Sequence, residues 1–441
     1  MDAFGVTTDW LRARARISPE ALALVIDGHH WRFGDLDALA SAVAAWLWAE
    51  GVRPGDHVAV LQPNTLATVA ATFALARLSA VVAPLNTRLP AGDVAWQVAR
   101  ADASSLLFCE RTEQQTADVP PAVRRLALPA GAAAFDAWAR ALPLTGFLPP
   151  PAPGLDSVQS ILFTSGTTGY AKGAMITFAN HFWSAIGSAF RLGVDRDDRW
   201  LVCLPLYHVG GLAILFRSCL YGTAVVLHDG FDVAAVGHSL RHDSVTLASL
   251  VPTMLVRLLH EGLVGCAAPA LRLVLLGGAA APASLVAEAR AAGLPVAVTY
   301  GLTEAASQVA TLLPDSAATK PGCTGRPLLF TAVAVVDEQG HPLPPNTPGD
   351  IIVAGPTVMA GYYRDEAATA AALRDGYLHT GDIGLLDSDG DLWLLDRRAD
   401  LIVSGGENVY PAEVERVLRE HPAVALAAVV GLPHPEWGQQ V

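Results

Sequence analysis

Short apolar runs that alternate with Ala- and Leu-rich helical segments constrain the fold of this chain more than any other feature. Residues 58–61 predict a buried strand, 66–78 a helix and 80–83 a second strand. A strand, a crossover helix and another strand form a βαβ unit, the building block of a mostly parallel sheet that is covered on both faces. The sequence therefore predicts an α/β fold of doubly wound sheets. Similar apolar runs recur at 224–227, 273–276 and 296–298.

The texture of the sequence changes at two places. A proline-rich stretch over 148–154 is incompatible with a helix or a central strand, so we expect it to connect two layers or subdomains. From Thr331 onward, strand-like alternation with turn signals at 337–340 and 387–391 predicts a small β-rich subdomain. A further boundary is expected near Asp396.

Charge and composition exclude several classes of partner. The net charge is −13 and no Lys/Arg-rich run occurs, which disfavours nucleic acid and anionic membrane surfaces. The stretch that most resembles a membrane span, 201–216, is shorter than the roughly 20 residues of a membrane helix and contains Pro and Gly. The N-terminus lacks the apolar core of a secretory signal, so a cytoplasmic location is expected. The five cysteines form no C-x-x-C pair, which argues against a disulfide framework and a zinc site.

A loop rich in glycines and hydroxyls, at 164–173, is the first candidate for chemistry. It follows the apolar run 161–163, a predicted strand. Glycines allow backbone N–H groups to point into one concavity, hydroxyls add donors and Lys172 adds positive charge, so the loop suits a polyphosphate. It is not a Walker A loop, because Ala171 precedes the lysine and Gly173 follows it. A glycine-rich surface turn is the alternative. The predicted phosphate-binding residues are Thr164, Ser165, Gly166, Thr167, Thr168, Gly169 and Lys172.

This loop resembles the phosphate-binding signature of the adenylate-forming superfamily, which contains acyl- and aryl-CoA synthetases, luciferases and adenylation domains of peptide synthetases. The segment 300–304 is similar to the second signature of that family. The resemblance implies that Tyr300, next to Gly301, stacks on adenine, that Thr303 contacts the α-phosphate and that Glu304 helps to hold Mg²⁺. Judged from residue types alone, Thr303 and Glu304 after a strand predict a helix start with Thr303 as its cap.

Two further motifs resemble the adenine and ribose contacts of the family. Residues 276–282 are similar to the adenine-side loop, although a plain strand-to-helix turn has the same composition. Asp382 matches the aspartate that accepts hydrogen bonds from both ribose hydroxyls. Arg397 matches an arginine that also contacts the ribose, and a surface ion pair is the alternative for it. The predicted adenine-side residues are Gly278, Ala279 and Ala280.

The last part of the chain resembles the beginning of the small C-terminal domain of the family, which rotates between the two half-reactions. Gly405 and Gly406 then line the tunnel for the CoA arm. We expect a large ATP- and acid-binding domain over 1–395, a hinge at 396–400 and the start of a C-terminal domain over 401–441. Relatives commonly carry Asp or Lys at the hinge position that here is Ala399. The catalytic lysine near the C-terminus of relatives has no counterpart, so we expect a fragment of a longer protein or weakened adenylation.

The segment 204–212 matches the family motif that forms a wall of the acyl pocket, with His208 as a gate or substrate contact and a structural histidine as the alternative. The run 211–222 and the pair Ser307 and Gln308 resemble o-succinylbenzoate–CoA ligases of menaquinone synthesis. The hydrogen-bonding groups of this pair would have no partner against a long alkyl chain, so they favour a polar aromatic acid as the substrate. Arg217 either pairs with a distal carboxylate or reaches solvent. The expected substrate contacts are His208, Val209, Gly210, Ser307 and Gln308.

Together these motifs predict an ATP-dependent acid–CoA ligase that forms an acyl-adenylate and then a thioester, with ATP, Mg²⁺ and coenzyme A as cofactors. 2-Succinylbenzoate is the expected acid, and another aryl or medium-chain acid is the alternative. Two rivals from other classes are a nucleotide-binding module with little turnover and an adenylation domain that loads a carrier protein. Thr303, Glu304 and His208 are the predicted catalytic residues. Assembly into a homo-oligomer is left open.

Overall fold

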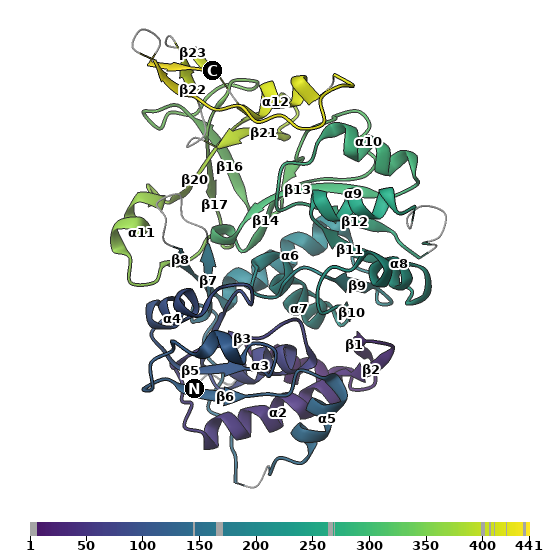
Figure 1. Ribbon diagram of the computed structural model, residues 1–441, viewed down its shortest axis with the longest axis vertical. Coiled ribbons are helices and arrows are strands. Elements are labelled where there is room, and N and C mark those ends of the chain that lie inside the picture. The colour runs from purple at the N-terminus through teal and green to yellow at the C-terminus, as the bar shows by residue number, and fades with distance from the viewer. Residues whose placement is uncertain are drawn as a thin grey trace.

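The computed structural model describes residues 7–143, 146–164, 171–262, 268, 270–397, 402–404, 407–409, 411–419, 421–434 and 438–441 (Figure 1). In this view the N-terminal elements lie at the bottom, a large sheet with its helices in the middle, and the C-terminal elements at the top. No helix within the described ranges is both long and apolar enough to cross a membrane.

A seven-stranded sheet occupies the N-terminal part, in the order β18-β8-β7-β4-β3-β5-β6. β3 and β4 pair in parallel and are joined by α3, which confirms the predicted βαβ unit. β7 and β8 form an antiparallel hairpin, and β18 pairs antiparallel with β8. The strands are β3 (His57–Leu61), β4 (Val81–Pro84), β5 (Ala103–Phe108), β6 (Arg124–Ala127), β7 (Val158–Thr164), β8 (Lys172–Thr177) and β18 (Gly361–Tyr362).

A nine-stranded sheet follows, in the order β15-β14-β13-β12-β11-β9-β10-β1-β2. Its central strands, from β1 to β13, are parallel, and β2, β14 and β15 add antiparallel edges. All three strands predicted for this region are present, and β13 continues past 298 to Leu302. The strands are β1 (Leu22–Ile26), β2 (His29–Arg32), β9 (Arg199–Val202), β10 (Ala224–Leu227), β11 (Leu247–Leu250), β12 (Leu273–Leu276), β13 (Val296–Leu302), β14 (Ser307–Leu312) and β15 (Arg326–Pro327).

The helix α3 (Leu66–Arg77) is the centre of the main hydrophobic core, because every one of its residues is buried. A helix that is apolar on all sides must lie inside the protein. Its only charged residue, Arg77, pairs with Asp9 at 2.8 Å and with Asp37. The other helices of the two large sheets are α1 (Trp10–Ile17), α2 (Phe33–Ala49), α4 (Ala91–Arg100), η1 (Glu113–Thr116), α5 (Ala132–Arg140), α6 (Phe178–Leu192), α7 (Val209–Tyr221), α8 (Val233–His242), α9 (Pro252–His260) and α10 (Ala283–Ala291).

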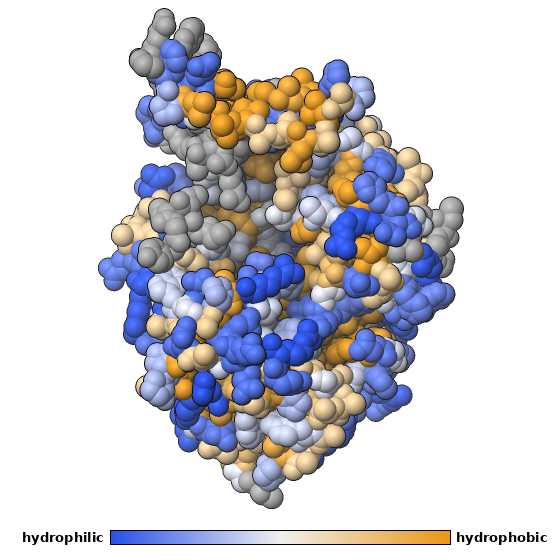
Figure 2. All heavy atoms as spheres, in the orientation of Figure 1, coloured by the Kyte–Doolittle hydropathy of each residue, from blue (hydrophilic) through white to orange (hydrophobic). Residues whose placement is uncertain are grey.

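The predicted β-rich subdomain is a five-stranded antiparallel sheet that begins just after Thr331, and the stretch 148–154 is a connector without helix or strand between α5 and β7. Beyond this sheet, Figure 2 shows a hydrophobic area at the top of the molecule, where the C-terminal part lies in Figure 1. Leu426 and Val430, between α12 and β24, are among the exposed apolar residues of this part. The remaining elements are β16 (Ala332–Val336), β17 (Gly349–Ala354), α11 (Glu366–Ala372), β19 (Leu373–Arg374), β20 (Tyr377–Leu386), β21 (Leu392–Arg397), β22 (Ile402–Ser404), β23 (Glu407–Val409), α12 (Pro411–Arg419), β24 (Leu432–His434) and β25 (Gly438–Gln440).

Candidate active site

The parallel arrangement of the nine-stranded sheet brings the sequence motifs to one edge. The carboxyl ends of parallel strands meet at the same edge of a sheet, where α/β proteins bind their ligands. The acyl-wall segment follows β9, the adenine-side loop follows β12, and Thr303 and Glu304 follow β13. Gly278, Ala279 and Ala280 form an exposed turn between β12 and α10, and Gly278 has a φ of +79°.

Tyr300 and Asp382, which were assigned to the adenine and the ribose, are in direct contact. The Tyr300 hydroxyl on β13 donates a hydrogen bond of 2.6 Å to the Asp382 carboxylate on β20. Burial raises the pKa of Tyr300 well above its ordinary value, and the nearby Asp382 charge raises it further, so the hydroxyl remains a donor. This contact joins the nine-stranded sheet to the β-rich subdomain. In the β20–β21 pair Arg397 stands opposite Asp382 in the backbone register, and its side chain is outside the described part of the structure.

The turn that carries Thr303 and Glu304 is a short 3-10 helix, η2 (Thr303–Ala305), within the β13–β14 hairpin. The predicted capping role of Thr303 is wrong, because the cap position is Leu302 and no side-chain capping bond is made. The chain reverses directly into β14 instead of entering a long helix, with positive φ angles at Ala306 and Ser307. Gly301 is required here, since a Cβ at this position would overlap the carbonyl oxygen of Ser307.

Glu304 and Lys172 come together around a residue that the sequence did not single out, Tyr362. The Tyr362 hydroxyl donates to Glu304 Oε1 at 2.8 Å, and Lys172 Nζ lies 5.3 Å from the centroid of the same ring. Among the described residues, no other side chain forms a hydrogen bond or an ion pair with the Glu304 carboxylate, so its second oxygen has no such partner there. A carboxylate oxygen is the ligand type that Mg²⁺ prefers, and the donor set therefore fits the predicted cation. The only local signal for Tyr362 is a glycine followed by two tyrosines.

The phosphate loop is the tip of the β7–β8 hairpin. Thr164 is the last residue of β7 and Lys172 the first of β8, and the Thr164 hydroxyl donates to the Lys172 carbonyl at 3.4 Å. The predicted loop 164–173 therefore overlaps the last residue of β7 and the first two residues of β8. The predicted residues Ser165, Gly166, Thr167, Thr168 and Gly169, and likewise Gly405 and Gly406, lie outside the described residues.

The acyl-wall segment is held by a buried asparagine from the other sheet. Asn64, in the turn between β3 and α3, donates to the carbonyls of Leu204 (2.9 Å) and His228 (3.1 Å). It also accepts a hydrogen bond of 2.9 Å from the Leu206 amide. These contacts fix the segment that leads to His208, the residue before α7.

The predicted wall residues lie where α7 begins. His208 is exposed, yet neighbouring protein displaces much of the surrounding water, which lowers its pKa, and the Arg88 charge lowers it further. Val209 and Gly210 form the start of the helix. On β14, Ser307 is half-buried and Gln308 is buried, with its amide nitrogen on Thr311 at 3.1 Å and its Oε1 without a partner. Successive strand residues face opposite sides of a sheet, so at most one of this pair faces a given pocket.

Arg217 is inside the protein, so the prediction that it reaches solvent is wrong. Its side chain, 1% exposed, lies between α7, α6 and β9 because this face of α7 packs inward. One terminal nitrogen donates to Ser184 at 3.1 Å, and the Nε atom has no partner. No carboxylate in the described ranges pairs with it. Nearby, burial and the Arg217 charge lower the pKa of His181 to about 3.

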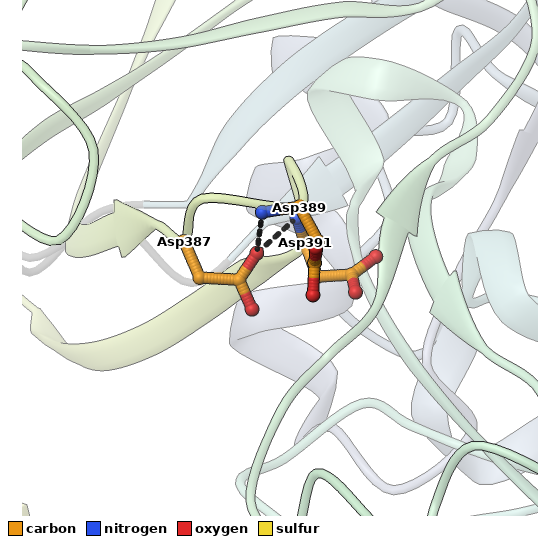
Figure 3. A group of neighbouring side chains, drawn as sticks. All are labelled: Asp387, Asp389 and Asp391. Carbon is orange, nitrogen blue, oxygen red and sulfur yellow. Dashed lines mark hydrogen bonds between the residues drawn. The ribbon is translucent and has the colours of Figure 1, made fainter.

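An acidic loop between β20 and β21 contains Asp387, Asp389 and Asp391 (Figure 3). Lys320 donates to all three carboxylates, at 2.8, 2.8 and 2.5 Å. Its ammonium thus supplies the positive charge that a metal ion would bring to such a group. We interpret this cluster as a structural tie between the loop and the segment before β15.

Comparisons with known proteins identify relatives of this chain. Residues 11–363 match the family model of the AMP-binding enzymes, and residues 413–441 match the model of their C-terminal domain. The chain is 42% identical to a 2-succinylbenzoate–CoA ligase of Bacillus licheniformis over 98% of this chain and 88% of the relative. It is 41% identical to an enzyme of the same name from Geobacillus kaustophilus over 98% of this chain and 86% of that relative.

Solved structures give the same picture. An o-succinylbenzoate CoA synthetase of Bacillus subtilis, in complex with its acyl-adenylate intermediate, superposes with a TM-score of 0.90 at 39% identity, covering 98% of this chain and 86% of that one. The same enzyme has been solved with ATP and magnesium ion, at a TM-score of 0.88 and 38% identity over 97% of this chain and 88% of that one. The predicted α/β fold and the resemblance to adenylate-forming enzymes are thus confirmed, and the chain belongs to the family of AMP-binding enzymes.

Proposed function

We propose that this chain is an AMP-forming acid–CoA ligase whose acid is 2-succinylbenzoate. ATP and the acid give an acyl-adenylate and pyrophosphate, and the adenylate then transfers its acyl group to the CoA thiol with release of AMP. ATP, Mg²⁺ and coenzyme A are its cofactors. The observation that carries the choice of acid is the buried Arg217 without a carboxylate partner, in a chain about 40% identical to ligases for this acid.

The nucleotide half of the site uses residues from three separate sheets. Tyr300 offers its ring to the adenine, and Asp382 accepts from the ribose hydroxyls once the Tyr300 hydroxyl gives way. Lys172 supplies positive charge at the phosphates, and Thr303 adds a hydroxyl donor beside the α-phosphate. Glu304 would hold Mg²⁺, which neutralises phosphate charge as the acid attacks.

The acid half of the site suits a dicarboxylate. A buried guanidinium without an opposite charge costs several kcal/mol relative to a paired one, because water no longer solvates it. 2-Succinylbenzoate has two carboxylates, of which one is activated and the other keeps its charge. We infer that the second carboxylate binds Arg217, with Ser184 and the buried polar edge of β14 beside it.

The C-terminal elements complete the second half-reaction in this proposal. Residues 1–395 bind ATP and the acid, 396–400 act as the hinge, and 401–441 belong to the mobile C-terminal domain. Gly405 and Gly406 line the CoA tunnel. The match of residues 413–441 to a C-terminal domain model supports this division.

The test is acid-dependent exchange of pyrophosphate into ATP, followed by detection of the CoA thioester by mass spectrometry. 2-Succinylbenzoate, benzoate and a medium-chain fatty acid are compared at equal concentration. Exchange and thioester formation with 2-succinylbenzoate alone support the proposal. A preference for benzoate or the fatty acid favours the alternative acids. ATP binding without either reaction favours a nucleotide-binding module, and exchange without thioester favours the loading of a carrier protein.

A further inference from the structure

Tyr362 lies between the two oppositely charged side chains of the proposed Mg·ATP site. Its hydroxyl is 2.8 Å from Glu304 Oε1, and its ring centroid is 5.3 Å from Lys172 Nζ. The Tyr362 hydroxyl is the donor in this contact, because an ionised carboxylate can only accept a hydrogen bond. An ammonium near the face of an aromatic ring is also attracted by the ring electrons.

The backbone around Tyr362 fixes the position of the ring. In β18, Tyr362 stands opposite Ala174 of β8, two residues after Lys172. Its amide donates to Thr369 at 2.9 Å. Upstream, the Met359 amide donates to the Glu304 carbonyl at 2.9 Å. Tyr362 is therefore tied to both the strand of the lysine and the turn of the glutamate.

Lys172 and Glu304 both contact the same tyrosine side chain, so an ion pair between them is the arrangement that competes with this one. Such a pair would compete with the phosphates for Lys172 and with Mg²⁺ for Glu304. Among the described residues, neither Lys172 nor Glu304 forms an ion pair. Each of them contacts Tyr362 instead.

We propose that Tyr362 is a positioning residue of the Mg·ATP site, a role that rests on the proposed function. Its hydroxyl holds one oxygen of Glu304 and leaves the other for the cation. Its ring keeps Lys172 apart from Glu304, so that the lysine stays available to phosphate.

Two substitutions separate these roles, and one neighbour provides the control. Tyr362→Phe removes the hydroxyl and keeps the ring, whereas Tyr362→Leu removes both. Tyr363→Phe is the matched control, because this tyrosine contacts His57 at 4.9 Å and Arg364 at 5.4 Å, away from the glutamate. Calorimetric titration of the full chain with ATP, in Mg²⁺ and separately in EDTA, measures binding without turnover.

We expect Tyr362→Phe to weaken ATP binding about tenfold in Mg²⁺ and to leave binding in EDTA unchanged, because the hydroxyl acts through the metal-binding carboxylate. Tyr362→Leu weakens binding in both conditions, since Lys172 then pairs with Glu304. Tyr363→Phe binds as the wild type does. Melting temperatures of all variants show that each protein is folded.

Equal losses for Tyr362→Phe in Mg²⁺ and in EDTA, or no loss in either, would overturn the inference. Failure of the proposed function gives a different result. If the wild type binds ATP with the expected Mg²⁺ dependence but makes no thioester from 2-succinylbenzoate, the assignment of the acid fails and the role of Tyr362 stands. If the wild type binds no ATP, the nucleotide site itself fails.

Discussion

Replacing Arg217 with methionine is expected to stabilise the protein and, at the same time, to abolish recognition of the second carboxylate of the acid. The guanidinium is 1% exposed, has a single hydrogen bond to Ser184 at 3.1 Å and has an Nε atom without a partner. Methionine is apolar, flexible and of similar length, so it fills the same space without an unpaired charge.

The size of both effects follows from the burial of the charge. Exchange of buried ionic groups for apolar side chains of similar volume is neutral or stabilising by about 1–4 kcal/mol. We expect about 2 kcal/mol, because the substitution removes a buried charge without a carboxylate partner while Ser184 loses only one donor. When the acid is bound, the same substitution is unfavourable, because it weakens the binding of the acid. Loss of one partner of a buried charge pair costs about 2–5 kcal/mol, which is roughly thirtyfold or more in affinity.

The assay compares 2-succinylbenzoate with two analogues that each lack one of its carboxylates. In the wild type the diacid has the lowest KM in pyrophosphate exchange. In Arg217→Met the KM of the diacid rises by roughly thirtyfold or more, and the analogue that keeps only the reacting carboxylate is used as well as before. Thermal melting without ligand shows the gain in stability. Arg217→Lys is the control, because it keeps the charge but not the planar fork. A lower melting temperature together with an unchanged KM for the diacid would refute the reasoning and make Arg217 a structural residue.

Three further predictions concern single positions. Gly301→Ala should lower the melting temperature and weaken ATP binding in calorimetry, because its Cβ overlaps the Ser307 carbonyl and forces β13 and β14 apart. His181→Gln should flatten the pH dependence of stability. The pKa of His181 is about 3 in the folded protein and about 6.5 unfolded, so the stability present above pH 6.5 falls by about 1.4 kcal/mol per pH unit below it. Urea unfolding at pH 7 and 5 should show a difference about 2 kcal/mol smaller in the variant. Lys320→Ala should lower the melting temperature, because Asp387 and Asp389 then lack a counter-charge and Asp391 keeps only Arg326. Millimolar Ca²⁺ should restore part of the loss.

Each of these expectations has a clear contrary result. Normal ATP binding by Gly301→Ala would mean that the hairpin tolerates a side chain at its tightest point. An unchanged pH slope in His181→Gln would assign the acid sensitivity to other groups. A Lys320→Ala protein that melts at the wild-type temperature would show that the acidic loop needs no internal cation.

The local pattern of the sequence predicted which segments are helices and strands much better than it predicted which strands pair with one another. β3, α3 and β4 were predictable because a parallel strand buried on both faces is an uninterrupted apolar run. Nothing in β1 indicates that it pairs with β10, a strand about 200 residues later. Strand order depends on such distant pairings, which leave no periodic signal. The capping role of Thr303 was wrong for a related reason: the hairpin partner β14, not the local Thr-Glu pair, decides where the chain turns.

The residues of the candidate site also divide into those that the sequence indicates and those that only the structure reveals. Tyr300, Asp382 and Glu304 were found because they stand in short motifs that resemble a family. Tyr362 and Asn64 were missed, since each acts through hydrogen bonds to residues far away in the sequence and neither changes the local pattern. The sequence also left the burial of Arg217 open, because a long charged side chain on an apolar helix either reaches solvent or is enclosed, and only the packing of α6 against α7 decides this.

Because the molecule carries a large net negative charge, the positions of individual cationic side chains matter for the binding of anionic ligands. A chain with a net charge of −13 must bind ATP, CoA and a dicarboxylate, all of them anions, against its own average field. Lys172 and Lys320 are its only two lysines. Lys320 is enclosed by three carboxylates, and Arg77 by two, so neither has charge left for a ligand. Lys172 and Arg217, by contrast, have no carboxylate partner in the described structure, and the proposed function assigns them to the phosphates and to the second carboxylate of the acid. In this proposal, a protein of this charge depends on keeping these two cations unpaired, and Tyr362 beside Lys172 and the burial of Arg217 away from the described carboxylates are the structural means by which it does so.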